Sequence, residues 1–170
     1  MKKMLETERL TLRELTLDDA AFILRLLNEP SFLRFIGDRG VRTLEDAHAY
    51  LLKGPLASYQ RFGFGLYLVE AKTEPAPLGI CGLIKRDTLP DVDIGYAFLP
   101  EFWSKGYAYE ASVAVLRDGQ ERLGLQRIVA IVSPDNDRSI NVLSKLGLRF
   151  EGMLTWPDDG AEVKLYAINC

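Results

Sequence analysis

The chain has 170 residues and a net charge of −3, with 48% hydrophobic and 26% charged residues. These values are ordinary for one globular unit with a hydrophobic core, so we expect a single domain over residues 1–170. The sequence has no basic block and no acidic tail, which argues against direct nucleic-acid binding through phosphate contacts. It also has no apolar run of about 18 residues, so no membrane span is expected.

The N-terminus begins with two lysines but then becomes charged, without the apolar segment of a secretory signal. We therefore predict a cytoplasmic protein. Cys81 and Cys170 lie far apart and neither has metal-type spacing, while His48 is the only histidine. These counts predict neither a disulfide framework nor a metal site.

The first half of the chain contains one strand, two helices and then three further strands. Residues 9–15 alternate between polar and apolar side chains, which predicts a half-buried strand. Capping residues and apolar spacing predict helices over residues 16–28 and 43–56, and Pro30 ends the first of them. Three β-rich segments typical of an antiparallel meander follow, at residues 63–71, 78–85 and 91–99.

The second half of the chain alternates helices and strands. Apolar residues recur at helical spacing over residues 106–123, and Gly124 provides a stop. Residues 127–132 are almost continuously apolar, as in a strand buried on both faces. A helix over 136–146 and two last strands, 148–154 and 162–168, complete the order β-α-α-β-β-β-α-β-α-β-β. This order predicts an α/β fold, with a mixed central sheet and helices on both faces.

The segment from Leu99 to Ala111 is the first candidate site, because a strand there passes through a short turn into a long helix. Amides in the first turn of a helix have no partners inside it, and together with the helix dipole they form an anion site. Gly106 and Ala108 leave room for a phosphate near the main chain, and Lys105 adds a cation. The alternative is an ordinary turn in which Gly106 only relieves strain.

A second candidate site lies at residues 133–148, where the next helix begins. Asn136 is placed to cap that helix, and Ser139 lies three residues later. Both residues can be helix-start residues and nothing more. Alternatively, their side chains face a ligand between the strands 91–99 and 127–132, since ligands of open α/β sheets gather at the carboxyl ends of parallel strands.

Several segments resemble the GNAT superfamily of acetyltransferases. The run Trp103 to Ala108 (WSKGYA) is similar to the family's pyrophosphate motif, Q/R-x-x-G-x-G/A. The longer run WSKGYAYEA resembles the W-G-x-G-Y-A-x-E-A version of the ribosomal-protein-alanine N-acetyltransferase-like branch. The segments TERLTLREL, DIGYAFLP, P-x-N-x-x-S and KLGLRFEG also resemble that branch, in the same order. Several motifs in the right order are specific, and together they cover essentially the whole chain.

Three positions depart from the family pattern. Trp103 replaces the commoner Gln or Arg, although Trp is usual in this branch. Ser104 stands where a second glycine is frequent, which is expected to stiffen the loop. Leu148 replaces a Phe after Leu-Gly, an apolar exchange.

The resemblance implies the GNAT fold and an enzyme that transfers acetyl from acetyl-CoA to a primary amine by direct attack, without a metal. It further implies a possible homodimer. The implied cofactor-binding positions are the amides of Ala97, Phe98 and Leu99, the loop residues Trp103, Ser104, Lys105, Gly106, Tyr107, Ala108 and Tyr109, and the helix-start residues Asn136 and Ser139.

Catalytic roles also follow from the resemblance. Ser139 resembles the residue that assists the departing thiolate, and Asn136 resembles one that holds the pantetheine region. Asp93 resembles an acidic position that acts as a general base through water, and the alternative is a solvated strand carboxylate. Tyr96, on the opposite strand face, is interpreted as a core residue. An amine-binding groove is expected from the first two helices, the loop between them (Pro30 to Arg42) and the last strands. The candidates are Phe32, Phe35, Arg39, Tyr67 and Trp156.

Two other classes of function are compatible with parts of this pattern. A non-catalytic sensor or partner module that binds CoA or acyl-CoA would use the same loop. A nucleotide-binding α/β protein would need G-x-G-x-x-G or a Walker lysine-serine pair, and the sequence has neither. The acceptor is chosen by variable loops, so a peptide N-terminus and a small-molecule amine both remain open.

Overall fold

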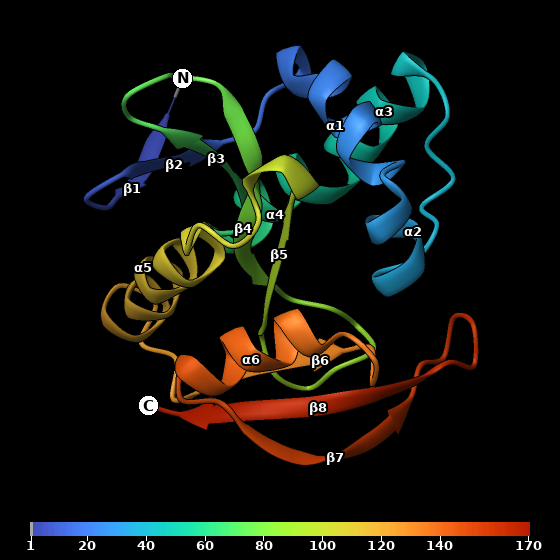
Figure 1. Ribbon diagram of the computed structural model, residues 1–170, viewed down its shortest axis with the longest axis vertical. Coiled ribbons are helices and arrows are strands. Elements are labelled where there is room, and N and C mark those ends of the chain that lie inside the picture. The colour runs from blue at the N-terminus through green and yellow to red at the C-terminus, as the bar shows by residue number, and fades with distance from the viewer. Residues whose placement is uncertain (1) are drawn as a thin grey trace.

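The computed structural model describes residues 2–170 (Figure 1). All eight strands form one sheet in the order β1-β2-β3-β4-β5-β6-β8-β7. Neighbouring strands are antiparallel except for the central β5–β6 pair, which is parallel. The strands are β1 Lys3–Glu6, β2 Leu10–Glu14, β3 Leu66–Ala71, β4 Pro77–Ile84, β5 Asp93–Phe98, β6 Arg127–Val132, β7 Arg149–Thr155 and β8 Glu162–Asn169.

Helices lie between these strands. The α-helices are α1 Ala20–Leu27, α2 Pro30–Phe35, α3 Leu44–Leu51, α4 Ala57–Phe62, α5 Tyr107–Glu121 and α6 Asp137–Lys145. Single 3₁₀ turns occupy Leu17–Asp19 and Pro100–Phe102, and a π-helical turn, Leu52–Leu56, joins α3 to α4. No helix among residues 2–170 combines the length and the apolar character needed to cross a membrane.

The predicted mixed sheet with helices on both faces is confirmed, but three elements were not predicted. The N-terminal segment forms the β1–β2 hairpin rather than one strand. Pro30 begins α2, because the first helical position needs no N–H and tolerates proline. The second predicted helix continues to Phe62 because the π-helical turn accommodates Pro55 within the helical path.

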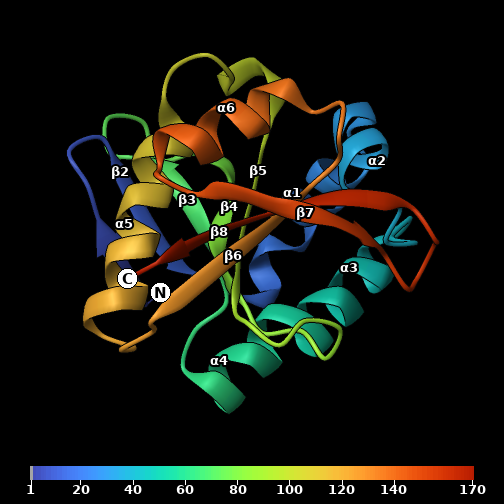
Figure 2. The same ribbon diagram turned by 90° about the horizontal axis from the view of Figure 1, so that it is seen from below.

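Each face of the sheet is covered by its own group of helices, as Figure 2 shows for α5 and α6 on one side and α3 and α4 on the other. Successive strand residues point to opposite faces, so Tyr67 joins the core under α5 and Leu68 the core under α1 and α3. The same alternation along β5 sends Tyr96 towards the α5 face and Ala97 towards the α1 face.

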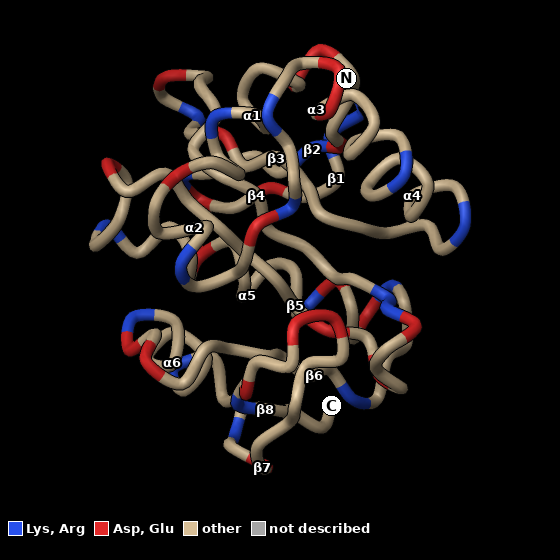
Figure 3. Tube along the Cα trace, turned by 90° about the vertical axis from the view of Figure 1, so that its right-hand side faces the viewer, with Lys and Arg blue, Asp and Glu red and all other residues tan. Residues whose placement is uncertain are grey.

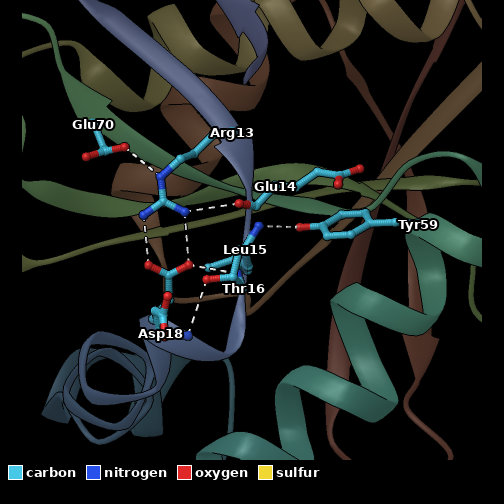
Figure 4. Close-up of polar contacts among 8 residues, drawn as sticks. Arg13, Glu14, Leu15, Thr16, Asp18, Tyr59 and Glu70 are labelled. Atoms are coloured by element: carbon cyan, nitrogen blue, oxygen red, sulfur yellow. Dashed lines mark hydrogen bonds and ion pairs between the residues drawn. The ribbon is translucent and has the colours of Figure 1, made fainter. Parts of the chain in front are cut away.

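A buried ion cluster joins β2, β3 and the turn before α1 (Figure 4). Arg13 donates from Nε to Glu70 at 2.7 Å and from both terminal nitrogens to Asp19 at 2.9 and 2.8 Å. The Arg13 and Asp19 side chains are only 9% and 7% exposed. Asp19 also accepts the N–H of Thr16 at 2.8 Å, completing a capping box. The cluster therefore fixes the entry of the chain into α1.

The sheet opens at its centre. Strands β5 and β6 pair at a single position, Asp93 with Val129, where the N–H of Val129 donates to Val92 at 3.0 Å. Beyond that point the two strands diverge, and Figure 1 shows the upper half of the sheet separating from the half formed by β6, β8 and β7. The carboxyl ends of β5 and β6 therefore border an open gap.

Candidate active site

A cleft of about 1260 Å³ occupies the gap between β5 and β6. Its lining combines the starts of α5 and α6 on one face of the sheet with residues of α2 and the α3–α4 segment on the other. Pockets for single small ligands usually measure about 300–1,000 Å³. The cleft is thus large enough for two ligands that meet between the strands.

The structure brings most of the sequence-predicted site residues to this cleft. The lining includes Asp93, Ala97, Phe98, Trp103, Ser104, Gly106, Tyr107, Ala108, Tyr109, Asn136 and Ser139. Two predicted residues are not part of it. Leu99 is 1% exposed and packs in the core below α1, and Lys105 is exposed outside the lining.

The loop before α5 presents unpaired amides to the cleft. Ser104 and Gly106 both adopt left-handed backbone conformations, with φ of 63° and 80°, and such alternation turns successive N–H groups to one side. The first α5 bond runs from the N–H of Glu110 to Gly106 at 3.0 Å. Within residues 2–170, the amides from Ser104 to Tyr109 donate to no acceptor. With the dipole of a 15-residue helix behind them, they form an anion site.

The β1–β2 hairpin supports this loop from outside the cleft. Arg9 donates from Nε to Glu110 at 2.7 Å and from Nη1 to the Lys105 carbonyl at 3.0 Å. Its guanidinium carbon lies 4.6 Å from the centroid of the Tyr107 ring, and Thr7 also hydrogen-bonds to Glu110. The loop conformation is thus held by contacts from about a hundred residues earlier in the chain.

Arg138, in the first turn of α6, reaches across to the same loop. It donates from Nη1 to Ser104 Oγ at 2.9 Å, and its guanidinium carbon lies 5.1 Å from the Trp103 ring. Trp103 in turn donates from its indole nitrogen to the Phe98 carbonyl at 2.8 Å. Arg138 was not predicted from the sequence, although a cation in the first turn of a helix opposes the helix dipole and was a usable signal.

Ser139 and Tyr96 form a hydroxyl pair inside the cleft. Their oxygens lie 2.7 Å apart, and burial raises the pKa of Tyr96 to about 12. Asn136 caps α6 by accepting the N–H of Ser139 at 3.4 Å. The Tyr96 ring packs against the core as interpreted, but its hydroxyl extends to Ser139, which the sequence analysis did not foresee.

Of the three amides proposed as donors at the end of β5, the strand geometry favours one. The N–H of Leu99 donates to Leu78 at 3.0 Å, so this amide is unavailable. Along an antiparallel strand, successive N–H groups point alternately towards one neighbouring strand and away from it. In the β4–β5 register, the N–H of Ala97 therefore points to β4, as that of Leu99 does. The N–H of Phe98 points to the opposite side, into the gap.

Asp93 lies where β5 and β6 meet, and its side chain is 1% exposed. The solvated-carboxylate interpretation of this residue is therefore wrong. Asp93 accepts from Arg86 Nε at 3.0 Å. Burial raises the pKa of the Asp93 carboxyl, and the neighbouring Arg86 guanidinium acts in the opposite direction.

The predicted groove residues separate into two groups. Phe32, Phe35, Arg39 and Trp156 line the cleft. Tyr67 lies elsewhere: it is 2% exposed and stacks on Tyr59 with ring centroids 5.8 Å apart. The reason is the strand alternation, which turns Tyr67 to the α5 face of the sheet.

Outside the cleft, residues 2–170 show no cluster of like charges (Figure 3) and no cluster of metal ligands. Acidic and basic residues are interspersed over both halves of the trace (Figure 3). Within the described part of the chain, no three His, Cys, Asp or Glu side chains are grouped to hold a metal ion. Cys81 is buried and Cys170 exposed, and both thiols are free.

Comparison with known proteins agrees with this geometry. The sequence profile described as "Acetyltransferase (GNAT) domain" matches residues 9–149. The "Uncharacterized N-acetyltransferase YoaA" of Bacillus subtilis (strain 168) is 32% identical over 157 residues, which span 91% of this chain and 87% of that protein. The chain therefore belongs to the GNAT family and is an acetyltransferase.

Solved structures place the fold in the same family. The acetyltransferase from Agrobacterium tumefaciens str. C58 superimposes with a TM-score of 0.83 at 25% identity, covering 98% of this chain and 94% of that one. The ribosomal L7/L12 α-N-protein acetyltransferase RimL, solved in complex with coenzyme A, has a TM-score of 0.78 at 18% identity, with coverage of 99% and 98%.

Proposed function

We propose that this protein is an acetyl-CoA-dependent N-acetyltransferase that transfers the acetyl group to a primary amine, either a peptide N-terminus or a small molecule. The observation that carries the proposal is the run of unpaired amides from Ser104 to Tyr109 at the start of α5, facing a cleft that passes between two strands. The similarity to RimL, solved with coenzyme A, supports the same co-substrate.

Residues from both sides of the gap would hold the co-substrate. The amides from Ser104 to Tyr109 donate to the diphosphate, and Arg138 adds a positive charge beside them. Asn136, at the start of α6, contacts the pantetheine region. The N–H of Phe98 faces the gap and donates to the thioester carbonyl, where negative charge develops during the reaction.

Acetyl transfer then needs a neutral amine and a departing thiolate that is stabilised by a hydrogen bond. The amine lone pair attacks the carbonyl carbon, so that a C–N bond forms and the C–S bond breaks with its electrons on sulfur. Asp93 takes the amine proton through water, and its raised pKa favours that role. Ser139 donates a hydrogen bond to the departing sulfur. Tyr96 stays protonated at neutral pH, because its pKa is about 12. In this scheme the Tyr96 hydroxyl is the donor of the 2.7 Å contact with Ser139, which leaves the Ser139 proton for the sulfur.

Ser139→Ala is expected to lower kcat about ten- to a hundredfold while the affinity for coenzyme A changes little. The substitution removes the donor to the leaving sulfur but leaves the loop amides in place. Tyr96→Phe should produce a smaller loss in kcat, since Ser139 keeps its hydroxyl. Steady-state release of coenzyme A measures kcat, and calorimetry measures the affinity. Weakened coenzyme A binding with unchanged kcat in Ser139→Ala would contradict the assigned role.

Asp93→Asn is expected to reduce kcat and to remove the acid limb of its pH profile. Protonation of Asp93 on the acidic side abolishes the base, so activity of the parent enzyme rises with pH through the pKa of that carboxyl. The uncharged amide in the variant has no such titration. A pH–rate profile of the two proteins, with circular dichroism as a folding control, makes the comparison. An identical acid limb in the variant would exclude Asp93 as the base.

The function itself is tested by acetyl-CoA consumption with a panel of peptides, polyamines, amino acids and aminoglycosides. We expect turnover with at least one class of amine. Tight coenzyme A binding without turnover on any of them would instead indicate a non-catalytic sensor.

A further inference from the structure

Cations line the cleft on the sheet face opposite α5 and α6. They include Arg39, Lys53, Lys85 and Arg86. Lys85 is already engaged, since its Nζ donates to the carbonyls of Arg86 and Leu89 at 3.1 and 2.9 Å. Carboxylates in this part of the lining are either paired, as Asp93 is, or exposed to solvent and therefore screened, as are Asp87, Asp159 and Glu162. Arg39 and Lys53 are exposed as well, so Lys85 and Arg86 are the cations of the more enclosed part of this surface.

Arg86 is half-buried, whereas Arg39 and Lys53 are exposed. Its side chain is 25% exposed, and Nε donates to the almost fully buried Asp93 at 3.0 Å. Trp156, just beyond β7, packs against the guanidinium, whose carbon lies 5.5 Å from the ring. The two terminal nitrogens of Arg86 donate to no acceptor within residues 2–170. A guanidinium is always charged and offers a planar pair of donors that matches a carboxylate or a phosphate.

Tyr50 and Arg39 extend this arrangement. Both residues line the cleft and also a smaller adjoining hollow of about 400 Å³. The positive charges of Arg39 and Arg86 both act on the Tyr50 hydroxyl, whose pKa is nevertheless raised by burial. In the described part of the chain, Arg39 forms no ion pair and the Tyr50 hydroxyl no hydrogen bond. Three donors therefore face one region of the cleft without acceptors.

We propose that the acceptor amine carries an anionic group, a carboxylate or a phosphate, which binds the terminal nitrogens of Arg86 together with Arg39 and Tyr50. This inference rests on the proposed acetyl transfer and specifies its acceptor. Asp93 holds Nε of the same guanidinium, so an acceptor anchored on Arg86 has its amine close to the proposed base. The anionic group of the acceptor then binds Arg86, while its amine lies beside Asp93.

Matched acceptor pairs test the proposal by calorimetry on protein saturated with coenzyme A, so the readout does not depend on turnover. Ala-Glu-amide is compared with Ala-Gln-amide for the carboxylate, and phosphoethanolamine with ethanolamine for the phosphate. We expect the anionic member of at least one pair to bind about tenfold more tightly or better. The pair that responds identifies the source of the anion. Affinities equal within about twofold in both pairs would overturn the proposal.

Variants then assign the preference to these residues. Arg39→Gln, Tyr50→Phe and Arg86→Lys should each lower the ratio of anionic to neutral affinity, with Arg86→Lys keeping a charge beside Asp93. Arg117→Gln is the matched control, an exposed arginine of α5 outside the cleft, and should leave the ratio unchanged. If Arg86→Lys does not fold, Arg39→Gln and Tyr50→Phe test the assignment. An unchanged ratio of anionic to neutral affinity in both of these variants would overturn it.

The two proposals fail in distinguishable ways. Anion-dependent binding without acetylation of any acceptor would contradict the proposed function and leave the anion site standing. Acetylation of neutral and anionic acceptors with equal kcat/KM, together with equal affinities, would contradict the anion site and leave the proposed function standing.

Discussion

Gly106→Glu is expected to weaken coenzyme A binding about a hundredfold or more. Gly106 has a φ of 80°, and a side chain there starts 3.4 Å from Arg9 Nη2. The new residue is strained in the left-handed region. Its carboxylate also brings a negative charge to the loop whose amides are proposed to donate to the diphosphate, and like charges brought together in a binding site cost several kcal/mol. Isothermal titration calorimetry measures the affinity directly.

Gly124→Glu is the matched control for this variant. Gly124 also has positive φ, 66°, and no heavy atom lies within 4 Å of an added side chain. It follows the other end of α5, so it introduces the same strain and the same charge away from the loop. Coenzyme A affinity should be unchanged in this control. Equal affinities in the Gly106 and Gly124 variants would refute the assignment of the loop.

Asp19→Ala is expected to lower the free energy of unfolding by about 3 kcal/mol or more. The substitution removes two short ion-pair bonds from Arg13, leaving the guanidinium buried with only Glu70 as a carboxylate partner. It also removes the acceptor for the N–H of Thr16. Urea denaturation, with the slope compared between variant and parent, measures the loss.

Asp18→Asn serves as the control for Asp19. Asp18 is the preceding residue in the same turn but is exposed, and surface substitutions of this type usually change stability by less than about 0.5 kcal/mol. A loss of stability at Asp19 no larger than at Asp18 would show that the buried cluster contributes little to the fold.

The alternation of secondary structure could be predicted because each pattern is local. The meander, the helix after Gly106 and the apolar strand at 127–132 all follow from periodicity within a few residues. The helix starting at Pro30 could not be distinguished from a helix stop, because proline serves both. The hairpin at the N-terminus depends on pairing with β3, which local sequence does not specify.

The part of the site that consists of main-chain amides could be predicted from the sequence. Unpaired amides at a helix start are a property of any helix, and Gly106 marks where the chain turns into it. Arg138 on Ser104, Tyr96 on Ser139 and Arg9 on Glu110 join residues 34, 43 and 101 positions apart. Such contacts exist only once the sheet is assembled, so local patterns do not predict which residues pair; only Arg138 carried a local signal, as a cation in the first turn of a helix. The burial of Asp93 likewise depends on the β5–β6 junction.

A crystal structure with bound coenzyme A tests the central claim most directly. We predict diphosphate oxygens within hydrogen-bonding distance of the main-chain nitrogens between Ser104 and Tyr109, with the pantetheine arm entering between β5 and β6. A complex in which the diphosphate occupies another surface, and these nitrogens contact only solvent, would contradict the account.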